Sequence, residues 1–150
     1  MKRLIAALAF ALAPSLAAAA QPVTHFAATR SPVPGPAGPA FSTAAMAGDT
    51  LYVSGVLDSD PVTNRMGATA EESSRLVLDA FKRGVEAGGL TMDDVVWVQI
   101  FGTDLSYYAK FNEIYRTYFK GPLPARAFIG TSQLLNGAHF EIMGVAVRSK

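Results

Sequence analysis

The sequence predicts a single α+β domain, in which a mixed β-sheet carries two helices on one face. Three observations support this fold class. Short β-branched or apolar segments alternate with two segments of helical periodicity, in the order strands, helix, strand, helix, strand, strand. About 130 residues follow an apolar N-terminal segment, which is the size of one ordinary domain. Neither an internal repeat nor a second domain is apparent.

Residues 1–20 have the pattern of a cleaved secretory signal peptide. Lys2 and Arg3 form a positive start, an uninterrupted apolar run follows, and alanines occupy positions 18–20. The apolar run is shorter than the ~20 residues that a membrane-spanning helix needs, so we expect no stable membrane anchor. We therefore expect a domain of residues 21–150 in the periplasm or outside the cell. A retained membrane anchor is the alternative.

Charge and composition argue against several functional classes. The chain has 13 Lys and Arg and 12 Asp and Glu, and two of the basic residues lie in the first twenty, so the mature net charge is about −1. A nearly neutral domain without basic clusters lacks the electrostatic footprint of a nucleic-acid-binding protein. The absence of cysteine excludes disulfides, thiolate catalysis and cysteine-ligated zinc. Phosphate-loop, metalloprotease and calcium-loop motifs are also absent, and we expect no metal or organic cofactor.

The first half of the chain contains two predicted strands and the clearest helix. Strands are expected at 23–28 and 51–56, and residues 41–47 form an apolar, ordered segment between them. The Pro- and Gly-rich stretch that ends at Pro39 cannot join a sheet or a helix, so it is predicted to be an extended loop, and residues 58–67 form a polar loop. The helix begins with a capping box and ends at a glycine pair. Its signals are Thr69 with Glu72 at the start, the apolar stripe Leu76, Ala80 and Phe81 flanked by Val77 and Val85, and Gly88 with Gly89 at the end.

The second half predicts a central strand, a second helix and two final strands. Residues 94–103 are apolar on both faces apart from Gln99, which is typical of a central strand. Asp104 is the predicted cap of a helix that continues through Phe119. The apolar and aromatic residues at helical spacing in it are Leu105, Tyr108, Phe111, Tyr115 and Tyr118 or Phe119. The last strands are expected at 125–131 and 140–147. Because both helices cover one face, the second apolar face of the sheet needs another cover, and a second copy of the chain is the natural candidate.

Two charged residues lie in strands that are otherwise apolar. Arg126 opens the strand at 125–131, and Glu141 lies in the strand at 140–147. Such charges are costly to bury unless they are paired or face a wet cleft. One interpretation is a structural ion pair or two exposed edges. The other is a shared pocket, in which Arg126 binds a substrate carboxylate with two hydrogen bonds and Glu141 orients or deprotonates water.

The two histidines give no metal-site pattern. His25 and His139 lie in unrelated segments of the chain. We interpret both as surface or edge-strand residues.

Six short motifs, in one order and at one spacing, resemble the RidA (YjgF/YER057c) family of imine deaminases, formerly called L-PSP endoribonucleases. They are LYVSG at 51–55, DVV at 94–96, FGTDL at 101–105, FNEIY at 111–115, PAR at 124–126 and EI at 141–142. The resemblance extends from about 41 to 147. It implies a chorismate-mutase-like fold, a homotrimer with a cleft at each subunit interface, and hydrolysis of reactive 2-imino acids to 2-keto acids and ammonia without a cofactor.

The resemblance also implies roles for individual residues. Arg126 would hold the carboxylate of the 2-imino acid, and Glu141 would handle the hydrolytic water. Ser54 would lie near the ligand, Asn112 matches an asparagine of the second helix, and Phe41 takes the place of a tyrosine that often covers the cleft. For these last three residues the alternatives are a hydroxyl bonded to backbone, a hydrogen bond on a helix face, and core packing.

The chain departs from the family pattern in the residues after two of the motifs. Ala127 and Phe128 follow Arg126, where the studied deaminases have a small polar residue and then Cys or Thr. Val56 replaces a common glutamine. These changes make the expected ligand-binding cleft more apolar, with Phe128 as one of its walls. A second hypothesis is therefore a trimer that binds a small carboxylate, or acts like a chaperone, without turnover. The charge balance argues against a ribonuclease.

Overall fold

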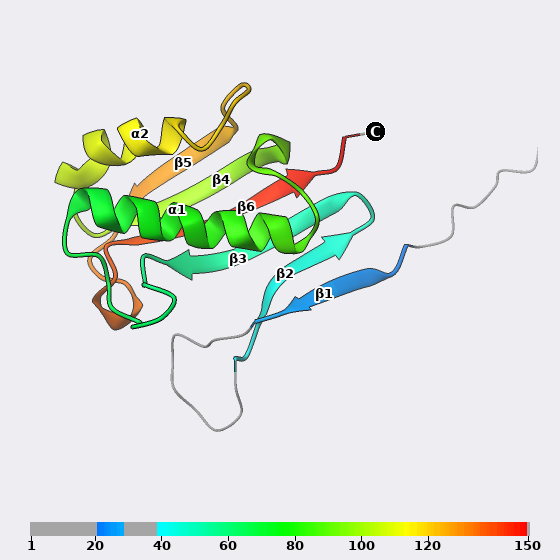
Figure 1. The fold of residues 1–150 in the computed structure, drawn as a ribbon, viewed down its shortest axis with the longest axis horizontal. Helices are drawn as coiled ribbons and strands as arrows, with labels where there is room; N and C mark the ends of the chain where they lie inside the picture. Colours follow the sequence, from blue (N-terminus) through cyan, green and yellow to red (C-terminus); the bar gives the residue numbers. More distant parts are fainter. Residues whose placement is uncertain (1–20, 29–38, 150) are drawn as a thin grey trace, which may run out of the picture.

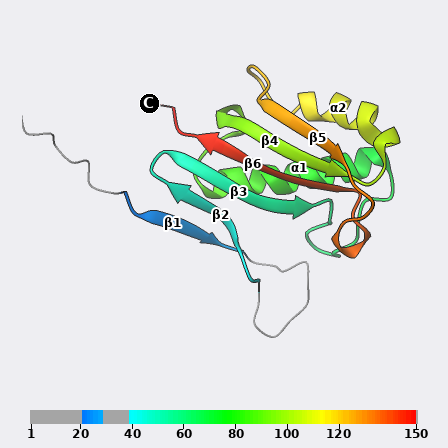
Figure 2. The same cartoon turned by 180° about the vertical axis from the view of Figure 1, so that it is seen from behind.

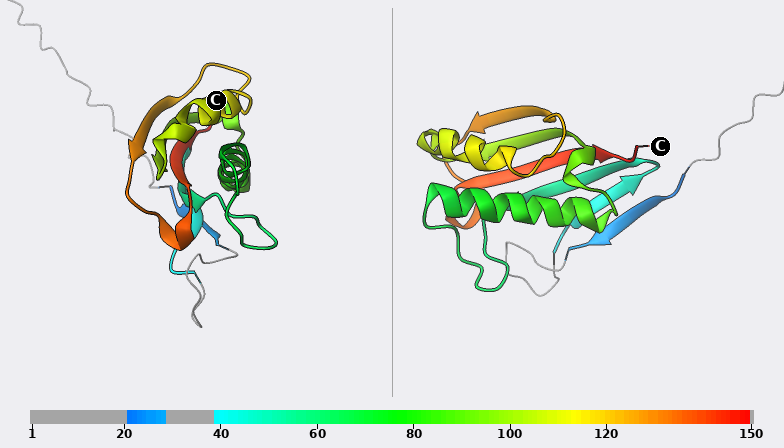
Figure 3. Two further views of the ribbon diagram at one scale, coloured as in Figure 1. Left: turned by 90° about the vertical axis from the view of Figure 1, so that its left-hand side faces the viewer. Right: turned by 45° about the horizontal axis from the view of Figure 1, so that its top comes forward.

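A computed structural model describes residues 21–28 and 39–149. The predicted signal peptide and most of the Pro- and Gly-rich loop lie outside these residues. In the described part, a six-stranded mixed sheet carries two helices on one face, which confirms the predicted fold class (Figures 1 and 3). Among the described helices, none is both long and apolar enough to cross a membrane.

The sheet has the spatial order β1-β2-β3-β6-β4-β5, in which β4 and β5 are parallel and all other neighbours are antiparallel. The final strand therefore lies in the middle of the sheet, and β5 forms one edge (Figure 1). Each predicted strand agrees with an observed one to within a residue at either end, and the ordered segment at 41–47 contains β2. The strands are β1 (Val23–Ala27), β2 (Ser42–Ala47), β3 (Thr50–Leu57), β4 (Val95–Gly102), β5 (Ala125–Gly130) and β6 (Phe140–Val147).

Helix α1 (Ala70–Ala87) starts and ends at the residues that its sequence predicts, but only half of the predicted capping box is formed, because the Glu72 carboxylate accepts the Ala68 N–H at 2.8 Å and not that of Thr69. The Glu72 backbone N–H donates to Thr69 Oγ1 at 3.1 Å, and Gly89 takes a left-handed φ of +71° just past the end. The buried stripe differs from the predicted one, because Leu76 and Ala80 are only half-buried. Its fully buried apolar members are Val77, Leu78, Phe81 and Val85.

The second helix is shorter than predicted. A 3₁₀ turn, η2 (Leu105–Tyr107), precedes α2 (Tyr108–Arg116), and Asp104 caps the turn by accepting the Ser106 N–H at 2.8 Å. The helix does not reach Phe119, because the Thr117 N–H bonds to Ile114 and tightens the chain into a turn.

One hydrophobic core lies between the helices and the sheet. Val98, Ile100, Phe140 and Ile142 of the central strands are fully buried under α1 and α2. The opposite face carries no helix in the described part of the chain (Figure 2). Large apolar side chains are nevertheless exposed along the sheet, with fractions of 53% for Tyr52, 36% for Trp97 and 40% for Ile129. The prediction of a sheet that is apolar on both faces is confirmed.

Candidate functional site

Arg126 lies on the helix-covered face of the sheet, at its β5 edge. In the parallel register Arg126 is paired with Val98, which is fully buried in the core below the helices. The guanidinium carbon lies 4.8 Å from the ring centre of Tyr115, 5.7 Å from that of Tyr108 and 5.9 Å from that of Phe128. These distances allow cation–π attraction, so three rings hold the charge in place.

The charge of Arg126 has no carboxylate partner in the described residues. None of the ion pairs found there includes it, and one of its terminal nitrogens, Nη2, donates to the Tyr108 hydroxyl at 3.3 Å. The alternative of a structural ion pair with Glu141 is therefore wrong within one chain. Guanidinium N–H donors that have no carboxylate partner, on a half-buried residue, suit an anionic ligand.

A hollow of about 450 Å³ opens directly beside Arg126. Leu105, Tyr108 and Phe128 form its other walls. Phe128 is held edge-on against Tyr108, with ring centres 4.9 Å apart, and against Phe111 at 5.5 Å. The Phe128 ring therefore lines the hollow on one side and packs against the hydrophobic core on the other. A cation beside apolar walls suits a small carboxylate with an apolar side chain.

Tyr108 interacts with both Arg126 and Asn112. A side-chain hydrogen bond from Asn112, one helical turn further along α2, is the main cause that lowers the pKa of the Tyr108 hydroxyl from its ordinary value, and the positive charge of Arg126 adds to it. Three predicted site residues, Arg126, Asn112 and Phe128, thus meet around a tyrosine that the sequence indicated only as part of a helical stripe. We call these four residues the arginine group.

Glu141 lies on the other face of the sheet. Its neighbours in β6, Phe140 and Ile142, point into the core, so alternation along the strand directs Glu141 away from the helices. Its carboxylate packs against Gly55, where an added Cβ would collide with it. No side-chain hydrogen bond to Glu141 is found in the part of the chain that the structure describes. Burial raises the pKa of this carboxyl above its ordinary value.

Ser54 lies in β3, which pairs with the strand that carries Glu141, and Phe41 lies directly before β2. Ser54 precedes Gly55, and its hydroxyl donates to the Ser42 carbonyl at 2.7 Å, which agrees with the alternative role of a hydroxyl bonded to backbone. Phe41 comes directly before β2 and is 41% exposed rather than packed in the core. With Glu141 and Gly55, these residues form what we call the glutamate group.

The two groups do not meet within one chain. The arginine group lies on β5 and α2 on the helix side, whereas the glutamate group lies on β2, β3 and β6, and Glu141 faces away from the helices. A site that uses Arg126 and Glu141 together therefore requires two copies of the chain.

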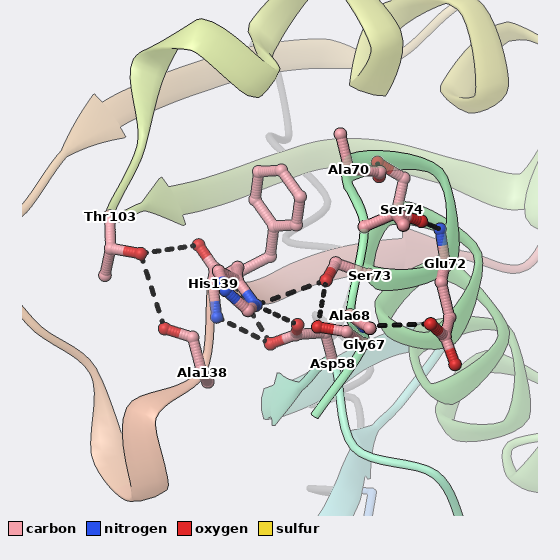
Figure 4. A network of polar contacts seen from close by, with 12 residues as sticks. Asp58, Gly67, Ala68, Ala70, Glu72, Ser73, Ser74, Thr103, Ala138 and His139 are labelled. Carbon is pink, nitrogen blue, oxygen red and sulfur yellow. Dashed lines mark hydrogen bonds and ion pairs between the residues drawn. The ribbon is translucent and has the colours of Figure 1, made fainter. Parts of the chain in front are cut away.

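A second polar network corrects the prediction for His139 (Figure 4). Asp58 lies in the predicted polar loop, but its side chain is fully buried and accepts the backbone N–H groups of His139 at 2.9 Å and Phe140 at 3.1 Å. His139, predicted to lie on the surface or an edge, holds its Nδ1 3.1 Å from Asp58 and 3.2 Å from the Ser73 hydroxyl. His139 is held in place because the backbone N–H groups at the start of β6 need hydrogen-bond acceptors, and the Asp58 carboxylate supplies them. His25 does lie on the edge strand β1, as predicted.

This network has the composition of a hydrolytic triad but not its geometry. Ser73 and Asp58 contact the same ring nitrogen of His139, whereas a proton relay needs them on opposite nitrogens. Ser73 is also fully buried, so no substrate reaches its hydroxyl. The network instead fixes the start of β6, two residues before Glu141. Among the described residues, no three His, Asp or Glu side chains converge into a metal-binding cluster.

Comparison with known proteins gives one consistent result. Residues 33–148 match the family described as Endoribonuclease L-PSP. A RutC family protein of Saccharolobus solfataricus is 38% identical and is matched over 77% of this chain and 92% of its own. A 2-iminobutanoate/2-iminopropanoate deaminase of Rattus norvegicus is 35% identical, with 73% and 80% covered. A protein of the same name from Dermatophagoides farinae is 34% identical, with 76% and 89% covered.

Solved structures show the same fold. RidA from a Psychrobacter species superposes with a TM-score of 0.69 at 32% identity, covering 78% of this chain and 94% of that one. TdcF of Escherichia coli, solved with bound serine, gives a TM-score of 0.71 at 30% identity, with 79% and 94% covered. The motifs, the fold and these relatives agree: the chain belongs to the endoribonuclease L-PSP family, to which the RidA and YjgF proteins also belong.

Proposed function

We propose that this protein hydrolyses 2-imino acids to 2-keto acids and ammonia. The observation that carries the proposal is the Arg126 guanidinium, which has no carboxylate partner in the described chain and faces a hollow with apolar walls. Relatives named 2-iminobutanoate/2-iminopropanoate deaminase support this reaction. The TdcF structure with bound serine supports a small ligand that carries a carboxylate.

The proposed active unit is a homotrimer with composite sites. Two facts support an assembly: the arginine and glutamate groups face opposite ways in one chain, and Tyr52, Trp97 and Ile129 are exposed on the sheet. Packing the edge of one subunit beside the open face of the next would bury this apolar surface and bring Arg126 of one copy near Glu141 of another. Closing the ring with three copies gives three equal sites.

In this mechanism Arg126 binds the substrate and Glu141 activates water. Arg126 would hold the carboxylate with two parallel hydrogen bonds, which fixes the position of the neighbouring imine carbon. Glu141 would orient the water that adds to that carbon and accept its proton. The partly buried setting that raises the pKa of Glu141 also makes its carboxylate a stronger base than a solvated one. The adduct then releases ammonia as the keto acid forms.

The second candidate function is carboxylate binding without turnover. Phe128 supports it, because this ring lies beside Arg126 where a hydroxyl or thiol would otherwise be available. Phe41, which also lacks a hydroxyl, supports it on the other side of the proposed cleft. We further propose that the protein is exported, on the evidence of the signal-peptide pattern in residues 1–20.

The experiment that distinguishes a deaminase from a carboxylate-binding protein uses imines generated in situ. D-Amino-acid oxidase with catalase generates 2-iminopropanoate from D-alanine, and a nucleophile competes with hydrolysis by trapping the imine. A deaminase lowers the trapped fraction and raises pyruvate formation, and the Arg126→Ala variant does neither. A binder changes neither quantity but still binds pyruvate. If the parent protein neither accelerates hydrolysis of several such imines nor binds the keto acids, both candidate functions are wrong.

A further inference from the structure

The Tyr108 hydroxyl lies beside the hollow in which a ligand held by Arg126 would bind. Tyr108 is 44% exposed, and it lines the hollow together with Arg126. Phe128 contacts its ring edge-on at 4.9 Å, and the guanidinium lies 5.7 Å from the ring centre. These contacts restrict the ring, so its hydroxyl is a fixed feature of the wall and not a mobile surface group.

The hydrogen bonds of this hydroxyl leave its proton free to donate. A phenol has one O–H donor and two acceptor lone pairs. Arg126 Nη2 donates to the oxygen at 3.3 Å, so the oxygen is the acceptor in this bond. No hydrogen bond from the Tyr108 O–H to an acceptor is found among the described residues, so its proton can be given to a ligand or to solvent.

The charges around Tyr108 favour loss of its proton. Arg126 on β5 and Arg116 on α2 are the charged groups that act on it, and both lower the pKa of the hydroxyl from its usual value of 10. Among the described residues no carboxylate acts in the opposite direction, and partial burial of the hydroxyl offsets only part of the lowering of its pKa. Tyr108 is therefore a stronger acid than a solvent-exposed tyrosine.

We infer that the Tyr108 O–H donates the proton that the substrate nitrogen needs in order to leave, an inference that rests on the proposed deaminase function. Water first adds to the imine carbon: its oxygen bonds to the carbon, the proton that Glu141 accepts from it passes to the nitrogen, and a 2-amino-2-hydroxy acid results. The Tyr108 proton passes to the amino nitrogen, the C–N bond breaks and ammonia departs. The carbon–oxygen double bond forms as the new hydroxyl loses its proton, which returns to the Tyr108 oxygen. One imine and one water thus give one keto acid and one ammonia, and Tyr108 is unchanged.

The test is Tyr108→Phe, which removes only the hydroxyl and keeps the ring against Phe128. With 2-iminopropanoate made from D-alanine, kcat should fall roughly 100-fold, the typical loss when a general acid is removed. The Kd of pyruvate should stay within about threefold, because Arg126 remains. The alkaline limb of the pH profile of kcat/KM should also disappear. Tyr107→Phe is the matched control, because Tyr107 packs against His139 and Phe140 and does not line the hollow.

Each other outcome has one meaning. A Tyr108→Phe variant with kcat within twofold of the parent and an unchanged alkaline limb would overturn the role of Tyr108 and leave the deaminase proposal standing. A variant that loses pyruvate binding along with turnover would also overturn the donor role, because Tyr108 would then act by positioning Arg126. A parent protein that turns over no imine would overturn both proposals.

Discussion

Removing the buried carboxylate of Asp58 should destabilise the fold strongly. Asp58→Ala leaves the backbone N–H groups of His139 and Phe140 without an acceptor in a buried place, where Asp58 now accepts them at 2.9 and 3.1 Å. Each unsatisfied buried donor costs about 1–3 kcal/mol. Relief of the cost of burying the charge offsets part of this sum. We expect a net loss of roughly 3–4 kcal/mol in the free energy of unfolding.

Asp58→Asn is the more conservative change. Its amide oxygen can still accept both backbone N–H groups, and its NH₂ lies within reach of the His139 ring. We expect a loss of about 1 kcal/mol. Glu86→Ala serves as the control, because its pair with Lys82 spans 3.7 Å between side chains that are about half exposed. Such a pair contributes roughly 0.5 kcal/mol at most.

Urea unfolding followed by the fluorescence of Trp97, the only tryptophan of the sequence, measures all three variants. Protein concentration is held constant, since assembly adds to the apparent stability. An Asp58→Ala variant within about 1 kcal/mol of the parent would show that the network does not hold the start of β6.

Three further predictions concern turnover, assembly and processing. Glu141→Gln should lower imine turnover about 100-fold while pyruvate affinity stays within a few-fold. Glu141→Gln should not lower the free energy of unfolding at pH 7. Burial raises the pKa of the Glu141 carboxyl, so the folded state is favoured while this carboxyl is protonated at low pH, and that contribution is lost as it ionises at higher pH. A destabilised variant at pH 7 would contradict this. Light scattering at micromolar concentration should give three times the chain mass, and Trp97→Asp should give monomers, whereas a stable parent monomer would exclude the composite site. Protein from the native host should begin at Gln21, and an intact Met1 would contradict export.

The elements that the sequence predicted well are those with local signals. Thr69 and Glu72 predict the start of α1, and the structure has the hydrogen bond between them. Gly89 adopts the left-handed backbone conformation that follows the end of the helix, a conformation that favours glycine. The second helix was predicted too long, because nothing local in the apolar spacing up to Phe119 indicates the turn at Thr117. The stripe of α1 was misplaced for a similar reason, since tertiary contacts decide which of two adjacent apolar residues is buried.

The candidate site was predicted only in part. Arg126 was identifiable because a charge in an apolar strand is costly without a function or a partner. Asp58 and His139 were not, because they lie 81 residues apart and only the pairing of β3 with β6 brings them together. Tyr108 was named for its helical spacing, and its closeness to Arg126 depends on how α2 packs over β5. Its position four residues before Asn112 was the available signal.

Titration of the protein with pyruvate by calorimetry tests the central claim, that Arg126 binds a carboxylate. Arg126→Ala should lose roughly 2–4 kcal/mol of binding free energy, or about 30- to 1000-fold in Kd, as a charge-assisted double hydrogen bond disappears. Arg126→Lys should recover only part of this affinity, since an ammonium lacks the planar fork. Arg75→Ala is the control, because Arg75 is exposed and its guanidinium pairs with no described residue other than Glu71 on α1. Parent-like pyruvate binding by Arg126→Ala would contradict the account.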